Sequence, residues 1–249
     1  MISDQTRKVL IFSKLKGVGR VKLEEIIKIE GFDIKNPEDI VSSIIKQRIV
    51  KIDKDALINA EEIAENDIQK SGGGASKIIS ILDNEYPEIL RKTVGKPTIL
   101  YIQGQMPKLP SVAIIGTREP TDHGKIITER ISQYFSENGW SIVSGLALGC
   151  DTIAHLTAVK NKSHTTAVLA HGLDTISPKS NEKLSEEILS TGGTLLTEYE
   201  FGAKPKPYQY AQRDLIQAGL SQGVIMIQSD IKGGSLIASS AAIKYGRIL

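Results

Sequence analysis

From residue 111 onward, short apolar segments alternate with longer segments of helical spacing. We expect strands in the apolar segments, at 112–115, 141–143, 167–170, 194–197 and 224–227. Helices are expected near 122–138, 152–161, 180–190, 209–221 and 235–246. Short apolar strands that alternate with helices of about 10–15 residues are typical of right-handed βαβ units in a parallel sheet covered on both faces. The pattern therefore predicts an α/β fold with a doubly wound, mostly parallel sheet.

The first 70 residues have a helical pattern instead. Apolar side chains recur at helical spacing between Val9 and Ile27, and Gly17-Val18-Gly19 interrupts them. Glycine adopts positive φ at little steric cost, so this break predicts a tight connection between two short helices. Pro37 suits the first turn of a third helix, and 55–69 has the pattern of a fourth.

Glycine and proline divide the chain into three parts. The strongest helix-breaking sequence is Ser71-Gly72-Gly73-Gly74, and a short β-rich run at 98–102 ends near Gly104. We therefore expect a small helical domain at 1–70, a connecting segment at 71–108 and an α/β domain at 109–249. The alternation also predicts a further strand from about residue 246, where the sequence ends.

Charge and cysteine content limit the classes of function. Lys and Arg number 31 against 29 Asp and Glu, a net charge of +2, so any nucleic-acid site must be a local concentration of positive charge. The single cysteine, Cys150, can form neither an internal disulfide nor a thiolate zinc cage, which favours a reducing, cytoplasmic location. Neither a signal peptide nor a run of about 18 apolar residues occurs, so no membrane association is expected.

The loop after the first strand of the α/β domain has the residues of a phosphate site. In open parallel sheets, ligands bind at the carboxyl ends of the strands, near helix N-termini. Gly116 allows close backbone approach, Thr117 offers a hydroxyl, and Arg118 offers a fork of donors. Asp122 is the expected N-cap of the next helix. The alternative is a glycine turn with a surface arginine.

Two further loops at the same sheet edge contain glycine. Ser144-Gly145 opens a loop that runs to a helix we expect Asp151 to cap, with His155 one turn inside. Asp151 and His155 are interpreted first as a local cap and a local hydrogen bond, and only second as functional groups. Gly233-Gly234-Ser235 opens the last helix and is a further candidate for phosphate contact.

Residues 201–213 combine positive charge with aromatic rings. The segment holds Lys204, Lys206 and Arg213 and no acidic residue, and it also holds Phe201, Tyr208 and Tyr210. Single-stranded nucleic acid is bound by cations that follow the backbone and rings that stack on the bases. An equally good interpretation is a proline-stiffened loop whose rings pack on the core.

Several sharper motifs are absent from the sequence. It contains no G-x-x-x-x-G-K-[ST], and the loop after the first strand is not G-x-G-x-x-G, so ATP and dinucleotide cofactors are not expected. No pair of nucleophile and base is evident. The histidines share no metal-ligand spacing, so no metal is expected either; they are His123, His155, His164 and His171.

Sequence blocks in a fixed order resemble the DNA-processing protein A family (DprA/Smf). The resemblance covers about residues 85–247. Its blocks are 112–118 (VAIIGTR), 144–151 (SGLALGCD) with Ala154-His155, 167–169 with 172–174, Asn181, Glu198, Arg213 with 218–221 (AGLS), and 234–236 (GSL), preceded by Tyr86-Pro87, Pro97, Leu100 and Gly104.

The resemblance implies a Rossmann-like domain that binds single-stranded DNA and forms a homodimer. It also implies help in loading the RecA recombinase during natural transformation, without enzymatic turnover. Gly116, Thr117 and Arg118 would form the phosphate pocket, and lysine and aromatic positions before Arg213 would extend the DNA path. Residues 15–19 resemble a helix-hairpin-helix, and the helical domain at 1–70 is expected to be of the helix-hairpin-helix or SAM-like type.

One departure from the family pattern bears on DNA affinity. The family usually has Arg-Asn-Arg where this chain has Arg213-Asp214-Leu215. Because a positive charge is exchanged for a negative charge and an apolar group, weaker or altered DNA binding is expected.

Two other functions stay open at this point. A sensor could bind a nucleotide in the same pocket, or a nucleoside-phosphate hydrolase could use Asp151, His155 or Glu198 for acid–base chemistry. No carboxylate follows Gly233-Gly234 through to the chain end, which argues against the hydrolase.

Overall fold

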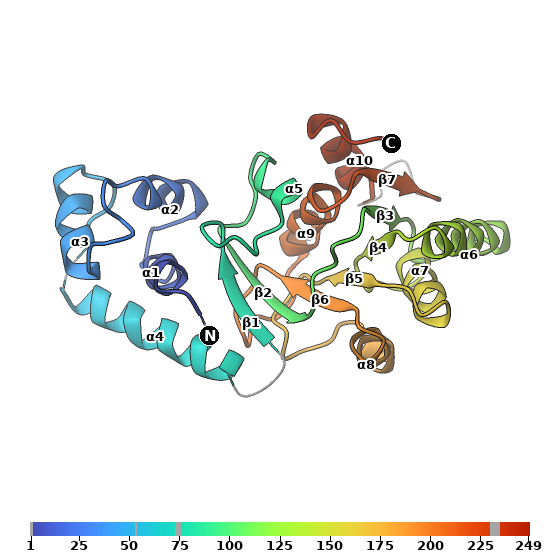
Figure 1. The fold of residues 1–249 in the computed structure, drawn as a ribbon, viewed down its shortest axis with the longest axis horizontal. Coiled ribbons are helices and arrows are strands. Elements are labelled where there is room, and N and C mark those ends of the chain that lie inside the picture. Colours follow the sequence, from blue (N-terminus) through green and yellow to red (C-terminus); the bar gives the residue numbers. More distant parts are fainter. Residues whose placement is uncertain (1, 53, 73–75, 230–234) are drawn as a thin grey trace. The chain divides into compact units, whose positions relative to one another are not determined.

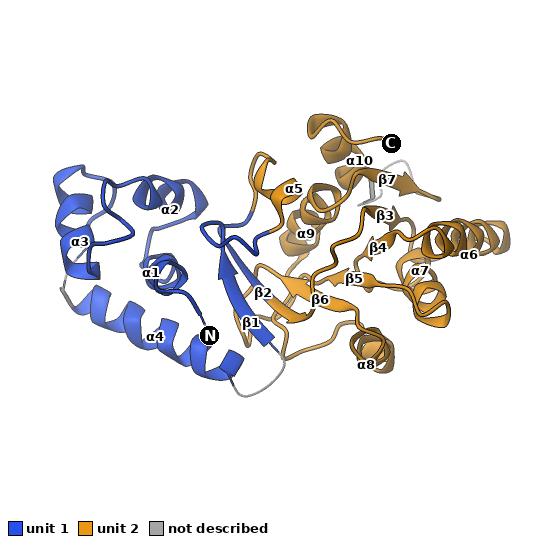
Figure 2. Ribbon diagram, in the orientation of Figure 1, with its two compact units in different colours: residues 1–86, 97–101 blue, residues 87–96, 102–249 orange. Residues whose placement is uncertain are grey.

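The computed structural model describes residues 2–52, 54–72, 76–229 and 235–249. The chain forms two compact units, coloured separately in Figure 2. Unit 1 comprises residues 1–86 and 97–101, and unit 2 comprises residues 87–96 and 102–249. Among the described residues, no helix is both long and apolar enough to cross a membrane.

Unit 1 contains the four helices that the sequence predicts. They are α1 (Asp4–Ser13), α2 (Arg20–Ile27), α3 (Pro37–Lys46) and α4 (Lys54–Gly72). Gly17, with φ +81°, lies in the turn between α1 and α2. Asn36 caps α3, because its side-chain oxygen accepts a hydrogen bond from the Asp39 N–H at 2.9 Å. The strand β1 (Ser76–Ser80) follows α4 and was not predicted.

Unit 2 is built around a parallel sheet. Its strands are the end of β2 (Ile99–Gly104), then β3 (Ser111–Ile115), β4 (Ser141–Ser144), β5 (Thr165–Val168), β6 (Thr194–Thr197) and β7 (Gly223–Met226). Within the unit, β6, β5, β4, β3 and β7 lie in that order, and neighbouring strands are parallel. Ala113 of β3 is in register with Val143 on one side and Val224 on the other.

Helices cover both faces of this sheet, as Figure 1 shows. The helices of unit 2 are α5 (Glu88–Arg91), α6 (Asp122–Glu137), α7 (Cys150–Lys160), the short 3₁₀ helix η1 (Lys179–Asn181), α8 (Glu182–Ser190), α9 (Pro207–Gly219) and α10 (Ser235–Lys244). Ala154 and Ala158 of α7 pack on Ile114 and Ile142, because small side chains allow a helix to approach the strands closely. The doubly wound α/β fold is thus confirmed.

The strand order reverses between β3 and β7. From β3 the chain continues to α6 and then to β4, β5 and β6 in turn, whereas β7 lies on the opposite side of β3 and is followed by α10. In Figure 1, α6 and α10 lie on opposite faces of the sheet. The loops after β3 and β7 therefore diverge, and such a point is where open parallel sheets bind their ligands.

Some local predictions were wrong. The strand β5 begins at Thr165, two residues before the predicted start, because Thr165 and Thr166 pair with β4. Thr121, and not Asp122, caps α6, since its hydroxyl accepts from the Gly124 N–H. Gly149, and not Asp151, is the N-cap of α7.

Two further elements lie outside the predicted pattern. The helix α5 was not predicted. Where a further strand was expected, Ile248 forms a single parallel bridge with Gly223.

Candidate nucleic-acid interface

A hollow of about 460 Å³ lies at the carboxyl ends of β3 and β7, where the strand order reverses. It is lined by the end of β3 and the loop after it (115–119), by Ala147 in the loop before α7, by Asp151 in the first turn of α7, and by one side of α9. Gln228 and Ser229, in the segment that follows β7, complete the lining. The sequence identified the loop after β3 but missed the two residues after β7, because the pairing of β7 with β3 is not visible in the sequence.

Tight packing on α7 fixes the loop after β3. A Cβ on Gly116 would lie 2.5 Å from the Cys150 Sγ, so the thiol occupies the space that this glycine leaves. The Thr117 N–H donates to the Gln228 carbonyl at 2.8 Å, and the Cys150 N–H donates to the Thr117 carbonyl at 3.2 Å. The role of Gly116 that the structure supports is therefore close packing, which holds Thr117 and Arg118 at the rim of the hollow.

Arg118 and Tyr210 come together although they are far apart in sequence. The guanidinium carbon of Arg118 lies 5.3 Å from the centroid of the Tyr210 ring, within the range of a cation–π contact. Arg118 is exposed and Tyr210 is half-buried. Both also line a smaller hollow of about 90 Å³ that includes Gly145 and His171. The ring of Tyr210 thus supports a solvent-accessible cation between the two hollows.

Arg213 lines the larger hollow but is only 5% exposed. Its Nε lies 3.0 Å from Oδ1 of Asp214, and its Nη1 lies 3.6 Å from Oδ2 of Asp151. Nη1 also donates to the Val168 carbonyl at 3.4 Å. Buried charges require such compensation. The predicted DNA cation Arg213 is therefore part of an internal ion-pair cluster with two carboxylates.

The loop that begins with Ser144 and Gly145 packs against the same ion-pair cluster. A Cβ on Gly145 would lie only 1.0 Å from Nη1 of Arg213, so the guanidinium occupies the space beside this glycine. Oδ2 of Asp151 accepts hydrogen bonds from the N–H groups of Gly145 at 3.1 Å and Ala147 at 3.4 Å. Ser144 is buried and donates to the Ile114 carbonyl at 2.7 Å. Ser144 and Gly145, both predicted to contact DNA, are thus engaged inside the protein.

Burial shifts the acid–base properties of the cluster. It raises the pKa of Asp214 to about 6, against the opposing effect of the Arg213 charge. Burial also raises the pKa of Asp151. For His155, burial and the neighbouring Arg213 charge lower the pKa to about 3. His155 is therefore neutral at pH 7, with Nδ1 2.8 Å from the Thr165 hydroxyl and Nε2 3.3 Å from the Leu146 nitrogen.

The lysines of the basic-aromatic segment lie outside the hollow. Lys204 and Lys206 are exposed, and Tyr208 is 60% exposed. Lys206 is the N-cap residue of α9, which begins at Pro207. The basic, aromatic segment follows β6, and of its candidates only Tyr210 and Arg213 line the hollow.

The last predicted group of contacts is only partly described. Gly233 and Gly234 lie outside the described residues, and Ser235 is the first residue of α10. Within the described ranges, no group of three or more His, Cys, Asp or Glu side chains is arranged to hold a metal ion.

A doubly wound parallel sheet with a hollow at its switch point defines a Rossmann-like α/β protein. The chain belongs to the DNA recombination-mediator protein A family, because the sequence model of that family matches residues 77–249. Protein Smf of Synechocystis sp. is 33% identical over 96% of this chain and 62% of its own length. The DNA processing protein DprA of Bacillus subtilis is 36% identical over 68% of this chain and 58% of its own length. The chain thus spans about 60% of the length of these curated relatives.

Two solved structures of the same family are similar to this chain. DNA processing protein A from Streptococcus pneumoniae superimposes with a TM-score of 0.81 at 29% identity, over 99% of this chain and 86% of that one. The protein from Helicobacter pylori, whose structure is described as giving its single-stranded DNA binding mode, matches with a TM-score of 0.64 at 33% identity, over 71% of this chain and 80% of that one.

Proposed function

We propose that this chain binds single-stranded DNA and acts as a recombination mediator in DNA uptake and natural transformation. The observation that carries the proposal is Arg118, an exposed guanidinium supported by Tyr210 at the rim of the switch-point hollow. The family to which the chain belongs and the DNA-binding relative from Helicobacter pylori support it.

The exposed groups suggest how the DNA would be held. Arg118 would bind a phosphate through its planar donors, with the Thr117 hydroxyl beside it. Tyr210 would orient Arg118, while the more exposed Tyr208 would offer a ring on which a base stacks. Lys204 and Lys206 would continue the phosphate path, and Gly233, Gly234 and Ser235 remain predicted contacts.

The proposal extends to partners and location. As a mediator, the chain would form a homodimer and help to load the RecA recombinase onto the bound strand in the cytoplasm. It would act by binding alone, with no turnover. Light scattering of the purified protein tests the dimer, and assembly of RecA on a protein-covered oligonucleotide tests the loading.

DNA binding is tested by fluorescence anisotropy of a labelled single-stranded oligonucleotide at several salt concentrations. We expect affinity to fall with salt, because phosphate contacts release counterions. Arg118→Ala should weaken binding about tenfold or more, since a hydrogen bond to a charged group contributes about 1.5–3 kcal/mol. Arg130→Ala removes an exposed cation of α6 outside the hollow and is the matched control. Equal binding by the two variants would show that Arg118 is not the phosphate contact.

The same assay separates the alternatives. Affinity of a DNA-binding protein should rise with oligonucleotide length, whereas a nucleotide sensor should bind a mononucleotide equally well. The acid–base candidates of a hydrolase are poorly placed, because Asp151 is paired with Arg213 and His155 is buried and neutral. Release of free base from a nucleoside monophosphate, abolished by Glu198→Ala, would nevertheless establish the hydrolase.

A further inference from the structure

Unit 1 has a basic groove of its own. A cavity of about 590 Å³ is lined by Lys22 of α2, Ile45 of α3 and residues 48–52, which follow α3. Of the described residues in this lining, Lys22, Arg48 and Lys51 are cations, the others are aliphatic, and none is acidic. We call this cavity the α2–α3 groove.

Arg48 has a backbone conformation that glycine usually adopts. Its φ is +57°, in the left-handed region. Its N–H donates to the Ile45 carbonyl and the Ile49 N–H donates to the Ile44 carbonyl, both at 3.1 Å, which is the hydrogen-bond pattern of a Schellman motif. Glycine would fit this position without the steric cost of a side chain. A strained arginine whose side chain lines a cavity points to a role for that side chain.

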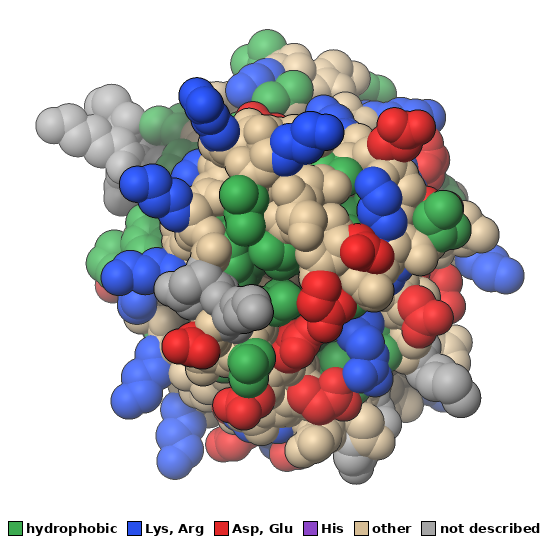
Figure 3. Space-filling view, turned by 90° about the vertical axis from the view of Figure 1, so that its left-hand side faces the viewer, with side chains coloured by type: hydrophobic (Ala, Val, Ile, Leu, Met, Phe, Trp, Pro, Cys, Tyr) green, Lys and Arg blue, Asp and Glu red, His purple; other side chains and the backbone are tan. Residues whose placement is uncertain are grey.

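Apolar surface is exposed beside these cations. Ile40 and Ile44 of α3 are fully buried, whereas Ile45 is 52% exposed and lines the groove. Val21, next to Lys22 in α2, is 72% exposed. Figure 3 shows this side of the molecule, with apolar side chains among Lys and Arg in its upper half and more Asp and Glu in its lower half. The exposed surface at Val21, Lys22 and Ile45 is therefore both apolar and basic.

We propose that the α2–α3 groove binds an acidic, amphipathic segment of a partner protein. Aliphatic side chains of the segment would pack on Ile45, Ile49 and Val50, and its carboxylates would pair with the three cations. Among the described residues, Lys22, Arg48 and Lys51 take part in none of the ion pairs. Arg48 and Lys51 are exposed and Lys22 is half-buried, so these cations are accessible from solvent.

The lining favours a peptide over nucleic acid. Single-stranded nucleic acid is held by aromatic rings on which its bases stack. The described lining of the groove has aliphatic side chains and no aromatic ring. Aliphatic surface next to cations instead complements a helix with leucines on one face and carboxylates on the other, which is a recurring mode of peptide recognition.

The test uses the full chain and a short fluorescein-labelled peptide of Leu and Glu with helical periodicity. Fluorescence anisotropy should show saturable, salt-sensitive binding, and the matching Leu and Lys peptide should not bind. Arg48→Gly should weaken binding about three- to fivefold, which is the effect expected from losing one exposed ion pair. Because glycine suits this backbone, the variant should keep or raise the thermal unfolding temperature.

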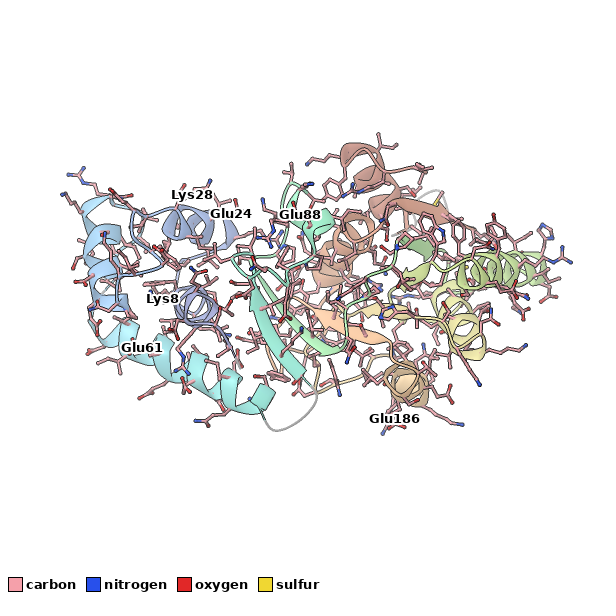
Figure 4. The ribbon with its side chains drawn as sticks, viewed as in Figure 1. Lys8, Glu24, Lys28, Glu61, Glu88 and Glu186 are labelled. Atoms are coloured by element: carbon pink, nitrogen blue, oxygen red, sulfur yellow. The ribbon has the colours of Figure 1, made fainter. Side chains whose placement is uncertain are left out.

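Control variants distinguish binding in the groove from a general effect of positive surface charge. Lys28→Ser removes an exposed cation next to α2, labelled in Figure 4, that lies outside the groove lining, and it should leave peptide binding unchanged. Ile45→Ser should weaken binding, and Arg118→Ala in unit 2 should not affect it. The proposal is overturned if the acidic peptide does not bind, if Lys28→Ser and Arg48→Gly act equally, or if an unlabelled oligonucleotide displaces the peptide from the Arg118→Ala variant.

Discussion

Arg118 and Arg213 line the same hollow of unit 2, yet their surroundings differ. The guanidinium of Arg118 is exposed and rests on the Tyr210 ring. That of Arg213 is buried between Asp151 and Asp214 and occupies the space beside Gly145. The first is accessible to a ligand, whereas the second compensates buried carboxylates and connects α9 to the start of α7.

A basic residue in a binding segment therefore need not be a binding residue. Arg118 lies in the loop after β3 and Arg213 lies in α9, the helix that follows β6. The sequence predicts both of them as DNA contacts. Burial distinguishes the two side chains. A cation that is removed from water must be paired with carboxylates inside the protein, as Arg213 is.

Removal of Arg213 is the strongest test of this comparison. Arg213→Ala leaves Asp151 and Asp214 buried without their cation, and breaking such a cluster costs about 3–5 kcal/mol. Urea unfolding should show this loss, whereas Arg118→Ala should change the free energy of unfolding by less than about 0.5 kcal/mol. If Arg213→Ala kept full stability and lost only DNA binding, Arg213 would be a ligand contact like Arg118.

A methyl group on Gly145 should disturb the same cluster. In Gly145→Ala the added carbon would overlap the Arg213 guanidinium and force it away from Asp151. Overpacking of this kind costs about 1–3 kcal/mol, measured as a shift of the urea midpoint. Gly19→Ala is the control, since a Cβ there meets nothing within 4 Å. Equal stability of the two variants would contradict the tight fit at Gly145.

Substitutions of Tyr210 test how the Arg118 side chain is held. Tyr210→Ala should lower DNA affinity several-fold, because a cation–π contact contributes about 0.5–2 kcal/mol to the position of Arg118. Tyr210→Phe keeps the ring and should bind nearly as tightly in the anisotropy assay. A loss in Tyr210→Phe as large as that in Tyr210→Ala would instead assign the role to the hydroxyl.

Asp214 should give DNA binding a modest pH dependence. Burial raises the pKa of its carboxyl to about 6, so the carboxylate near Arg118 is negative above that pH and neutral below it. Phosphate affinity should therefore rise as the pH falls through about 6, and Asp214→Asn should flatten this rise and bind more tightly at pH 7. Anisotropy titrations across this range measure both effects; a wild-type profile equal to that of Asp214→Asn would exclude Asp214 as the titrating group.

The same pKa predicts a stability change. The raised folded-state pKa means that the native state binds this proton more tightly than the unfolded chain does. The contribution of Asp214 to stability is therefore greatest below its ordinary value of 3.8 and is lost as the pH rises through about 6. The difference in unfolding free energy between wild type and Asp214→Asn should follow this course.

The regular elements of the fold were largely predictable from the sequence. The strand β6 matches its predicted bounds, and the four helices of unit 1 follow from apolar spacing and the breaks at Gly17 and Pro37. These features depend on neighbours along the chain, which a sequence displays directly. The missed elements, β1 and α5, are short and carry little periodicity of their own.

The candidate site was predictable only in part. Residues 116–118 could be identified because they follow a strand and precede a helix, which is a local property. The support of Arg118 by Tyr210, the lining by Gln228 and the internal pairing of Arg213 with Asp151 all join distant segments. The sequence alone determined which residue types reach this sheet edge. Which cations stay in water and which are buried depends on the folded arrangement, because desolvation and pairing depend on neighbours that strand order and helix packing bring together.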